Sequence, residues 1–199
     1  MTNNFIEASK RERWAFQQLL KTTKLFNDPQ YVIWISPEDG FDVYDVLIQK
    51  IVDGSVKQRF YIELKNRMLS PDILEMCKND GYILEKKKYD SLVKAKLDPE
   101  TRLIYINFTP EKTIIWDLDK TDMDWTKKKM NKATMASRNN KVSKSVTLLK
   151  EEKGKHYEYI FNEDDYQRDI KKQLLKKENK VIGKKDRDYL WDFLNGKNN

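Results

Sequence analysis

Cysteine and histidine are almost absent from this chain of 199 residues, which has one of each, Cys77 and His156. A disulfide framework needs pairs of cysteines, and the common structural zinc sites need several cysteines or histidines. Serine and cysteine hydrolases of the triad type need a histidine beside the nucleophile. The sequence therefore nearly excludes these classes, and any bound metal is expected to be a hard cation held by oxygen atoms.

Long apolar runs are also missing. No stretch approaches the roughly 20 apolar residues of a membrane span, and residues 1–10 lack the apolar centre of a secretory signal. Hydrophobic residues make up 39% of the chain and charged residues 36%, which is enough apolar material for a folded core under a highly charged surface. We therefore expect a soluble, cytoplasmic globular protein with no membrane partner.

Acidic residues are missing from residues 125–150, although the chain as a whole has many. Residues 1–119 hold 18 Lys/Arg and 19 Asp/Glu, whereas residues 120–199 hold 21 and 13, so the net charge of +7 comes from the second part. A basic surface of this kind is typical of proteins that bind the phosphate backbone of DNA, and a solvated lysine-rich surface explains it equally well. The residues expected to contact DNA here are Lys127, Lys128, Lys129, Lys132, Arg138, Lys141 and Lys144.

Hydrophobic periodicity predicts most of the first 125 residues as regular structure. A helix is expected at 4–21, and strands are expected at 31–36, 42–51 and 56–67, with a hairpin turn at Asp53-Gly54. Ser70-Pro71 opens a helical stretch that breaks near 79–81 and resumes, with Tyr82 and Leu84 on its buried side. Two further strands are expected at 102–108 and 112–117. The order is helix, three strands, helix, two strands.

The remaining residues show weaker periodicity. Residues 126–143 are expected to form a long loop, and a strand at 144–149 is expected to pair with 157–161. Helices are expected at 163–179 and 184–194. We therefore expect a core of residues 1–125 with a basic C-terminal extension, 126–199, packed on it as one structural domain.

Two carboxylates and a lysine are placed where a metal-dependent nuclease needs them. Glu63 and Lys65 are two residues apart on an apolar strand, so their side chains leave the same face. Residues 48–57 are long enough to bring the preceding strand alongside, so Asp45 and Glu63 can share a cation. Mg²⁺ held this way activates a water and neutralises phosphate charge, while Lys65 steadies the hydroxide or the phosphate. The alternative is an ion pair on a solvated strand face.

Neighbouring residues leave some assignments open. Asp42 is a rival to Asp45, but the two point to opposite faces of a regular strand. We favour Asp45, which directly precedes the apolar run 46–48. Arg67 shares the face of Glu63 and suits a phosphate oxygen, or equally a salt bridge at the rim.

The order of elements and these residues resemble the PD-(D/E)xK nuclease superfamily. The resemblance covers roughly residues 5–108 and implies an α/β (α+β) fold with a restriction-endonuclease-like αβββαβ core, in which helices flank a mixed central sheet. Asp45 corresponds to the first metal-binding aspartate of that superfamily, and Glu63-Leu64-Lys65 corresponds to its (D/E)-x-K element. Proline does not precede Asp45, a departure that many members share.

The resemblance also implies roles for residues outside this motif. Glu12 corresponds to a glutamate that faces the metal from the first helix, with Glu7 as its rival. The segment 83–92 resembles a pattern of phage-type nucleases and resolvases with Lys88 at the lysine position, and only the resemblance prefers Lys88 to Lys87. The carbonyl of Leu64 is implied as a further metal ligand.

The function expected from these features is hydrolysis of DNA by an Mg²⁺-dependent nuclease, with Mn²⁺ able to substitute, in a bacterial or phage-infected cell. A second hypothesis is a nucleic-acid-binding or structural protein that keeps the fold without catalysis. A third is a subunit of a larger complex, anchored through the aromatic C-terminus around Trp191. The form of the substrate and a homodimeric state are left open by the sequence.

Overall fold

The computed structural model describes residues 3–37, 42–67, 69–131 and 141–174. The chain divides into two compact units, residues 1–161 and 162–199. In the second unit residues 163–174 are helical, as expected for 163–179, and the rest of that segment lies outside the described residues. The helix expected at 184–194, with Trp191, also lies outside them. No helix of the described part is long and apolar enough to cross a membrane.

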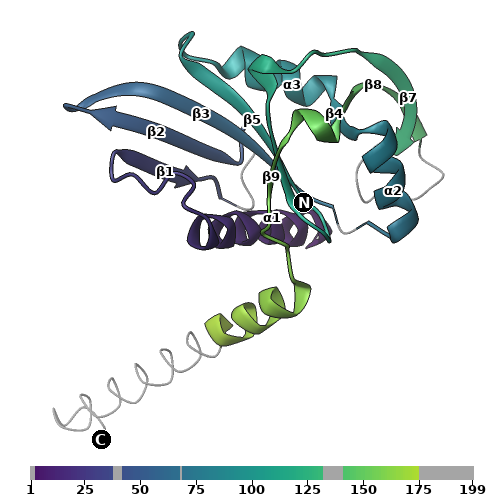
Figure 1. Cartoon of the computed structure of the whole chain (residues 1–199), viewed down its shortest axis with the longest axis horizontal. Coiled ribbons are helices and arrows are strands. Elements are labelled where there is room, and N and C mark those ends of the chain that lie inside the picture. Colours follow the sequence, from purple (N-terminus) through teal and green to yellow (C-terminus); the bar gives the residue numbers. More distant parts are fainter. Residues whose placement is uncertain (1–2, 38–41, 68, 132–140, 175–199) are drawn as a thin grey trace, which may run out of the picture. The chain divides into compact units, whose positions relative to one another are not determined.

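The first unit is built on a mixed six-stranded sheet with the order β1-β2-β3-β5-β6-β9 (Figure 1). The strands are β1 Tyr31–Ile35, β2 Val46–Val52, β3 Ser55–Asn66, β5 Thr101–Phe108, β6 Thr113–Asp117 and β9 Lys155–Tyr157. β3 and β5 are parallel, and the other neighbours are antiparallel. The mixed α/β class expected from the sequence is confirmed.

The hairpin between β2 and β3 turns at Asp53 and Gly54, as expected. Both residues have positive φ, 51° and 71°, which is the backbone that a two-residue turn of the favoured hairpin type requires. The turn, together with a register shift between Lys50 and Ile51, sets the register in which Val46 pairs with Ile62. The start of β2 is thereby held beside the middle of β3, where the sequence places Glu63.

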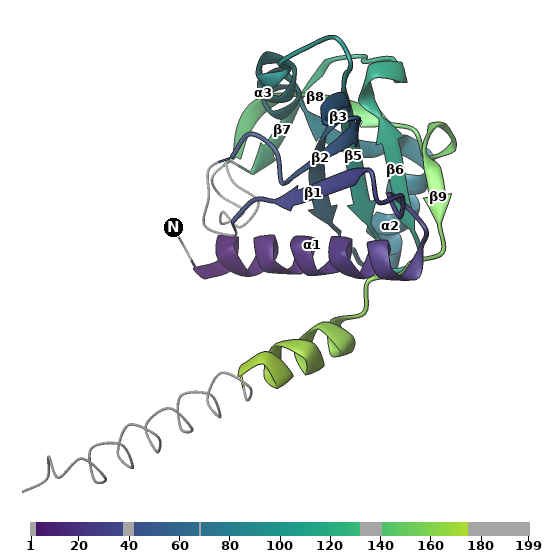
Figure 2. The same cartoon turned by 90° about the vertical axis from the view of Figure 1, so that its left-hand side faces the viewer.

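Helix α1, Asn3–Thr22, lies along one side of this sheet (Figure 2). Its residues Ala15, Phe16 and Leu19 recur at helical spacing and are fully buried. The opposite side of the sheet is covered by α3, Lys86–Ala95, and by a second, three-stranded sheet. Tyr61 and Tyr105 of the large sheet pack there against Leu92 of α3 and Leu84.

The three-stranded sheet has the order β4-β8-β7, and it differs from what the periodicity predicts. Its strands are β4 Tyr82–Glu85, β7 Thr126–Asn131 and β8 Lys141–Leu149. The periodicity predicts that residues 82–85 continue the helix that begins as α2, Pro71–Asp80. The helix ends instead at Gly81, whose φ of +110° is open to glycine alone. Tyr82 and Leu84 are buried, but on a strand.

Two further expectations for the second half of the chain are wrong. Residues 126–131 form β7 instead of a loop; lysine has a low strand propensity, and only the antiparallel partner β8 stabilises this edge strand. Residues 155–157 pair with β6, not with the strand at 144–149. A short 3₁₀ turn, Glu151–Lys153, separates β8 from β9, so the chain passes from one sheet to the other instead of forming a hairpin.

Candidate functional site

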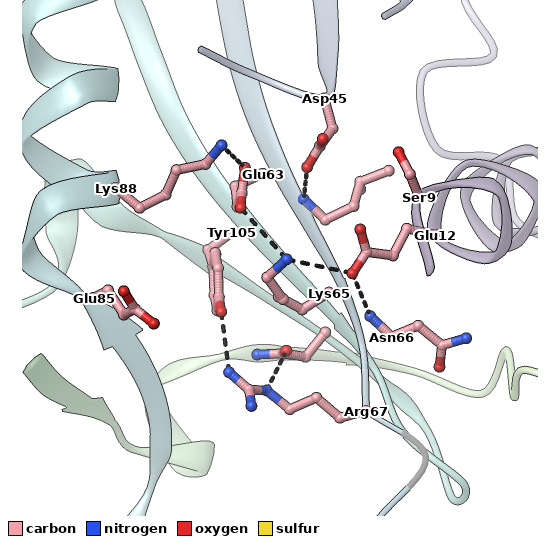
Figure 3. A network of polar contacts seen from close by, with 12 residues as sticks. Ser9, Glu12, Asp45, Glu63, Lys65, Asn66, Arg67, Glu85, Lys88 and Tyr105 are labelled. Atoms are coloured by element: carbon pink, nitrogen blue, oxygen red, sulfur yellow. Dashed lines mark hydrogen bonds and ion pairs between the residues drawn. The ribbon is translucent and has the colours of Figure 1, made fainter. Parts of the chain in front are cut away.

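The expected site residues converge on the second half of β3 from three elements and the segment before β2 (Figure 3). β3 carries Glu63 and Lys65 on one face, and the Lys65 Nζ lies 3.7 Å from the Glu63 Oε1. The remaining residues come from α1, from the residue that precedes β2, and from α3. The fold thus brings together side chains that are far apart in sequence.

Glu63 is a buried carboxylate, with 4% of its surface exposed. Burial, and next the negative charge of Asp45, raise its pKa to about 8, against the lowering effect of Lys65 and Lys88. The charged form of this carboxylate is therefore costly unless positive charge lies close to it. A bound cation would offset the free-energy cost of ionising Glu63 in its buried position.

Lys65 is held by Glu12 of α1. The Lys65 Nζ donates to the Glu12 Oε1 at 3.3 Å, and the same oxygen accepts the backbone N–H of Asn66 at 3.3 Å. Burial by itself lowers the pKa of Lys65, but Glu12 and Glu63 raise it overall above its ordinary value, so the ammonium stays charged. Glu7, the rival to Glu12, pairs instead with Lys10.

Lys88 reaches the same carboxylate from α3. Its Nζ lies 2.6 Å from the Glu63 Oε2, an oxygen that is buried and makes no hydrogen bond of good geometry with the described residues. The contact is therefore an ion pair in which the ammonium and the carboxylate oxygen do not have the geometry of a hydrogen bond. Lys87, the rival to Lys88, is exposed on the far side of the helix turn.

Asp45 stands immediately before β2, and its backbone N–H donates to the Ile62 carbonyl at 2.9 Å. Its Oδ2 accepts the backbone N–H of Leu64 at 2.8 Å. This bond fixes the carboxylate against the Glu-x-Lys segment, and its negative charge acts on Glu63. Asp42, the rival ligand, is exposed.

Arg13 is a part of the site that sequence reasoning missed. It is buried, and its Nη2 lies 3.4 Å from the Asp45 Oδ1. Its other donors bind the carbonyl oxygens of Ser36 and Ser9, so it ties α1 to the segment before β2. The charged run 10–13 looks like a solvated helix face, and nothing local marks this one arginine as buried.

A pocket of about 530 Å³ lies between the two sheets, with part of the site on its wall. From the large sheet and α3 it is lined by Glu63, Lys65, Arg67, Tyr105 and Lys88. From the small sheet it is lined by Ile83, Leu84, Glu85, Lys129, Met130, Lys141 and Lys144. Glu63 and the lysines of β3 and α3 therefore face lysines of β7 and β8 across one cavity.

The residues expected to bind DNA are placed unequally around this pocket. Lys129 and Lys141 are exposed and line it. Lys144 lines it too, but its Nζ pairs with Glu85 at 2.8 Å. Lys127 and Lys128 are exposed on β7 and do not line the pocket. The remaining two, Lys132 and Arg138, lie outside the described residues.

Arg67 is engaged inside the protein. Its Nε donates to the Asn107 Oδ1 at 3.0 Å, and its Nη2 donates to the Ile83 carbonyl at 2.7 Å and to the Tyr105 hydroxyl at 3.3 Å. The guanidinium thus links β3, β5 and β4. The phosphate contact expected for it has to compete with these bonds, and a structural role explains its position directly.

Few groups near the pocket can hold a metal ion. Within the described residues no group of three or more His, Cys, Asp and Glu side chains is arranged for this. Asp45 and Glu63 supply two carboxylates, and the Leu64 carbonyl is the third ligand that the sequence implies. Mg²⁺ suits so small a set, because it keeps several waters and is often bound by one or two carboxylates. The donors present fit Mg²⁺ better than a metal that needs a full protein cage.

Comparison of this chain with protein-family models, with curated proteins and with solved structures finds no match. The function has to be inferred from the site itself.

Proposed function

We propose that this protein is a metal-dependent nuclease with a restriction-endonuclease-like core, and that it hydrolyses phosphodiester bonds of DNA in the pocket between the two sheets. The observation that carries the proposal is the contact network that joins Asp45, Glu63, Lys65, Glu12 and Lys88. Three of these residues, Glu63, Lys65 and Lys88, line the pocket. The alternative, an ion pair on a solvated strand face, does not explain why Glu63 is only 4% exposed.

Asp45 and Glu63 would hold Mg²⁺ or Mn²⁺ together with the Leu64 carbonyl, and the bound ion would supply an acidic water and neutralise phosphate charge. Lys65, oriented by Glu12, presents an ammonium toward the scissile phosphate or the attacking water. Lys88 supplies a second positive charge on the other side of Glu63. Lys129 and Lys141 on the opposite wall hold phosphates of the DNA by charge.

A catalytically inactive DNA-binding protein is the second candidate. It is favoured by the small number of metal donors in the described part of the chain and by the ion pair of Lys88 with Glu63, which places an ammonium where a cation would otherwise sit. Both candidates use the same lysines for binding, so binding alone does not separate them.

The decisive experiment is a cleavage assay on linear, circular, single-stranded and branched DNA with Mg²⁺, with Mn²⁺ or with EDTA. Glu63→Gln and Lys65→Met are expected to lower the cleavage rate at least about a hundredfold, because each removes a group that acts on the reacting atoms. DNA affinity should change little, which would show that both variants remain folded. Wild-type protein that binds DNA but never cuts it with either metal would establish the second candidate.

Two neighbouring lysines give a matched control for the role of α3. Lys88→Ala removes the ammonium at Glu63, whereas Lys87→Ala removes an exposed lysine from the same helix. We expect the first variant to lose most of the cleavage activity and the second to keep it. Equal activity of both variants would remove Lys88 from the site.

A further inference from the structure

A row of apolar side chains, two of them aromatic, continues from the site along the same face of the six-stranded sheet. Trp34 of β1 pairs with Leu47 of β2, and Leu47 pairs with Tyr61 of β3, so the three side chains share one face. Tyr61 stands two residues before Glu63 on β3, and its side chain therefore leaves the face that carries the site. The row leads from the carboxylate to the sheet edge.

The cover over this face ends before the edge is reached. Tyr61 lies in the core beneath α3 and the small sheet, whereas Trp34 is 43% exposed. Val32, two residues earlier on β1, is 50% exposed. An indole exposed on an edge strand forgoes the free energy of burial and adds to the risk of aggregation, so packing within the described residues does not explain its presence.

Tyr44 joins the exposed indole to the site. Its ring stacks on Tyr61, with 4.5 Å between centroids and 23° between planes, and it directly precedes Asp45. Trp34 meets the Tyr44 ring edge to face, at 6.0 Å and 80°. Whichever ring supplies the edge, at least one face of the indole is left uncovered by Tyr44.

The distance to the site suits a nucleic acid strand that runs out of the pocket. Trp34 and Tyr61 are separated by two strand spacings, about 10 Å, and Tyr61 and Glu63 by two residues of β3, about 7 Å. A base on the indole would therefore belong to a nucleotide next to the scissile phosphate or a few positions from it. Lysines of the pocket, Lys129 and Lys141, supply positive charge for phosphates of the same strand.

We propose that Trp34, supported by Tyr44, is a stacking platform for an unpaired base of the bound strand, so that the substrate is single-stranded DNA or DNA with an unpaired end. Base-on-aromatic stacking needs a free base face, and a base inside a duplex has both faces covered by its neighbours. The proposal rests on the proposed function and narrows its substrate class.

Binding in EDTA tests the platform without requiring cleavage. A fluorescein-labelled oligonucleotide, single-stranded or annealed to its complement, is titrated with wild-type protein, Trp34→Ala, Trp34→Phe and Val32→Ala. Trp34→Ala is expected to raise the Kd for the single strand about 5- to 100-fold, the range that corresponds to loss of one stacked base. Trp34→Phe should keep most of the affinity, Val32→Ala all of it, and duplex affinity should be the same for every variant.

Three results would overturn the platform: unchanged single-strand affinity of Trp34→Ala, an equal loss for duplex, or a change of oligomeric state on gel filtration, which would make Trp34 a contact between copies. The two proposals fail separately. Cleavage with Mg²⁺ and no effect of Trp34→Ala would remove only the platform. The expected binding losses without any cleavage by wild-type protein would remove only the nuclease.

Discussion

At the scale of single residues, Glu63 is the group whose surroundings depart furthest from those of an exposed carboxylate. Its pKa is raised from 4.5 to about 8, by burial first and by Asp45 second. In the unfolded chain the group ionises near its ordinary value, so the folded state binds a proton that the unfolded state has already released between these two pH values. The resulting stability is complete below pH 4.5 and is lost as the pH rises to about 8.

This linkage predicts that the metal-free protein becomes less stable between pH 5 and pH 8. Relative to Glu63→Gln, which cannot ionise, wild-type protein should lose a free energy of unfolding on the order of a few kcal/mol across that range. Urea unfolding of both proteins in EDTA at several pH values measures the difference. If the free energies of unfolding of the two proteins change with pH in parallel, the pKa of Glu63 is not raised in the folded state.

The other site residues illustrate how much a side chain's role depends on its neighbours. Glu12 belongs to the charged run 10–13 in the sequence, and its contacts with Lys65 and Asn66 come from β3, more than fifty residues away. Arg13 is next to it and is buried against Ser36 and Asp45. Helical spacing places Glu12 beside the buried stripe of Ala15 and Leu19, but it does not distinguish Arg13 from the exposed charges around it.

At the scale of elements, the turn at Gly81 decides whether residues 82–85 continue a helix or form β4. Gly81 has φ of +110°, and a Cβ there would lie 3.0 Å from the Leu149 carbonyl oxygen of β8. Gly54 also has positive φ, +71°, but a Cβ there would have no neighbour within 4 Å. Alanine variants at the two glycines therefore allow the free-energy cost of the backbone conformation to be separated from the cost of a close contact.

We predict that Gly81→Ala destabilises the protein more than Gly54→Ala. The second change costs about 1 kcal/mol, the usual cost of a left-handed backbone at a non-glycine residue. The first costs about 1–3 kcal/mol for its rarer backbone conformation, and the contact with β8 adds to this. Free energies of unfolding from urea titration measure both. Equal losses would mean that β4 and β8 can move apart without cost.

β4 matters for function because it fixes one wall of the pocket. Its Ile83 carbonyl accepts hydrogen bonds from Arg67 and Tyr105 of the large sheet, and its Glu85 holds Lys144 of β8. The small sheet, with its lysines, is thereby attached next to Glu63. A helix at these residues would leave β8 and β7 without a neighbouring strand on that side.

At the scale of the whole molecule, the uneven charge along the chain becomes a basic wall opposite Glu63. We predict that Lys129→Glu with Lys141→Glu weakens DNA binding and lowers the slope of log Kd against log salt by about 1 to 2, because each lysine releases counterions when it meets a phosphate. Lys21→Glu with Lys94→Glu changes the net charge equally at exposed helix positions away from the pocket.

Anisotropy titrations of single-stranded DNA at several salt concentrations compare these two double variants. The control pair is expected to keep the wild-type slope and most of the affinity. If both pairs weaken binding to the same extent, the basic residues act through net charge alone, and the wall formed by β7 and β8 has no special role.

By itself the sequence determined the elements that are locally encoded: α1, the β2–β3 hairpin with its turn at Asp53-Gly54, and β5 and β6. These follow from apolar periodicity and turn chemistry, which act within a few residues. The placement of Glu63 and Lys65 on one strand face follows in the same way. Only the tertiary structure decided that β4 and β7 are strands, that β9 pairs with β6, and that Arg13 and Lys88 reach Asp45 and Glu63. Each of these depends on partners that the chain supplies from distant segments, and no local pattern records which segments meet.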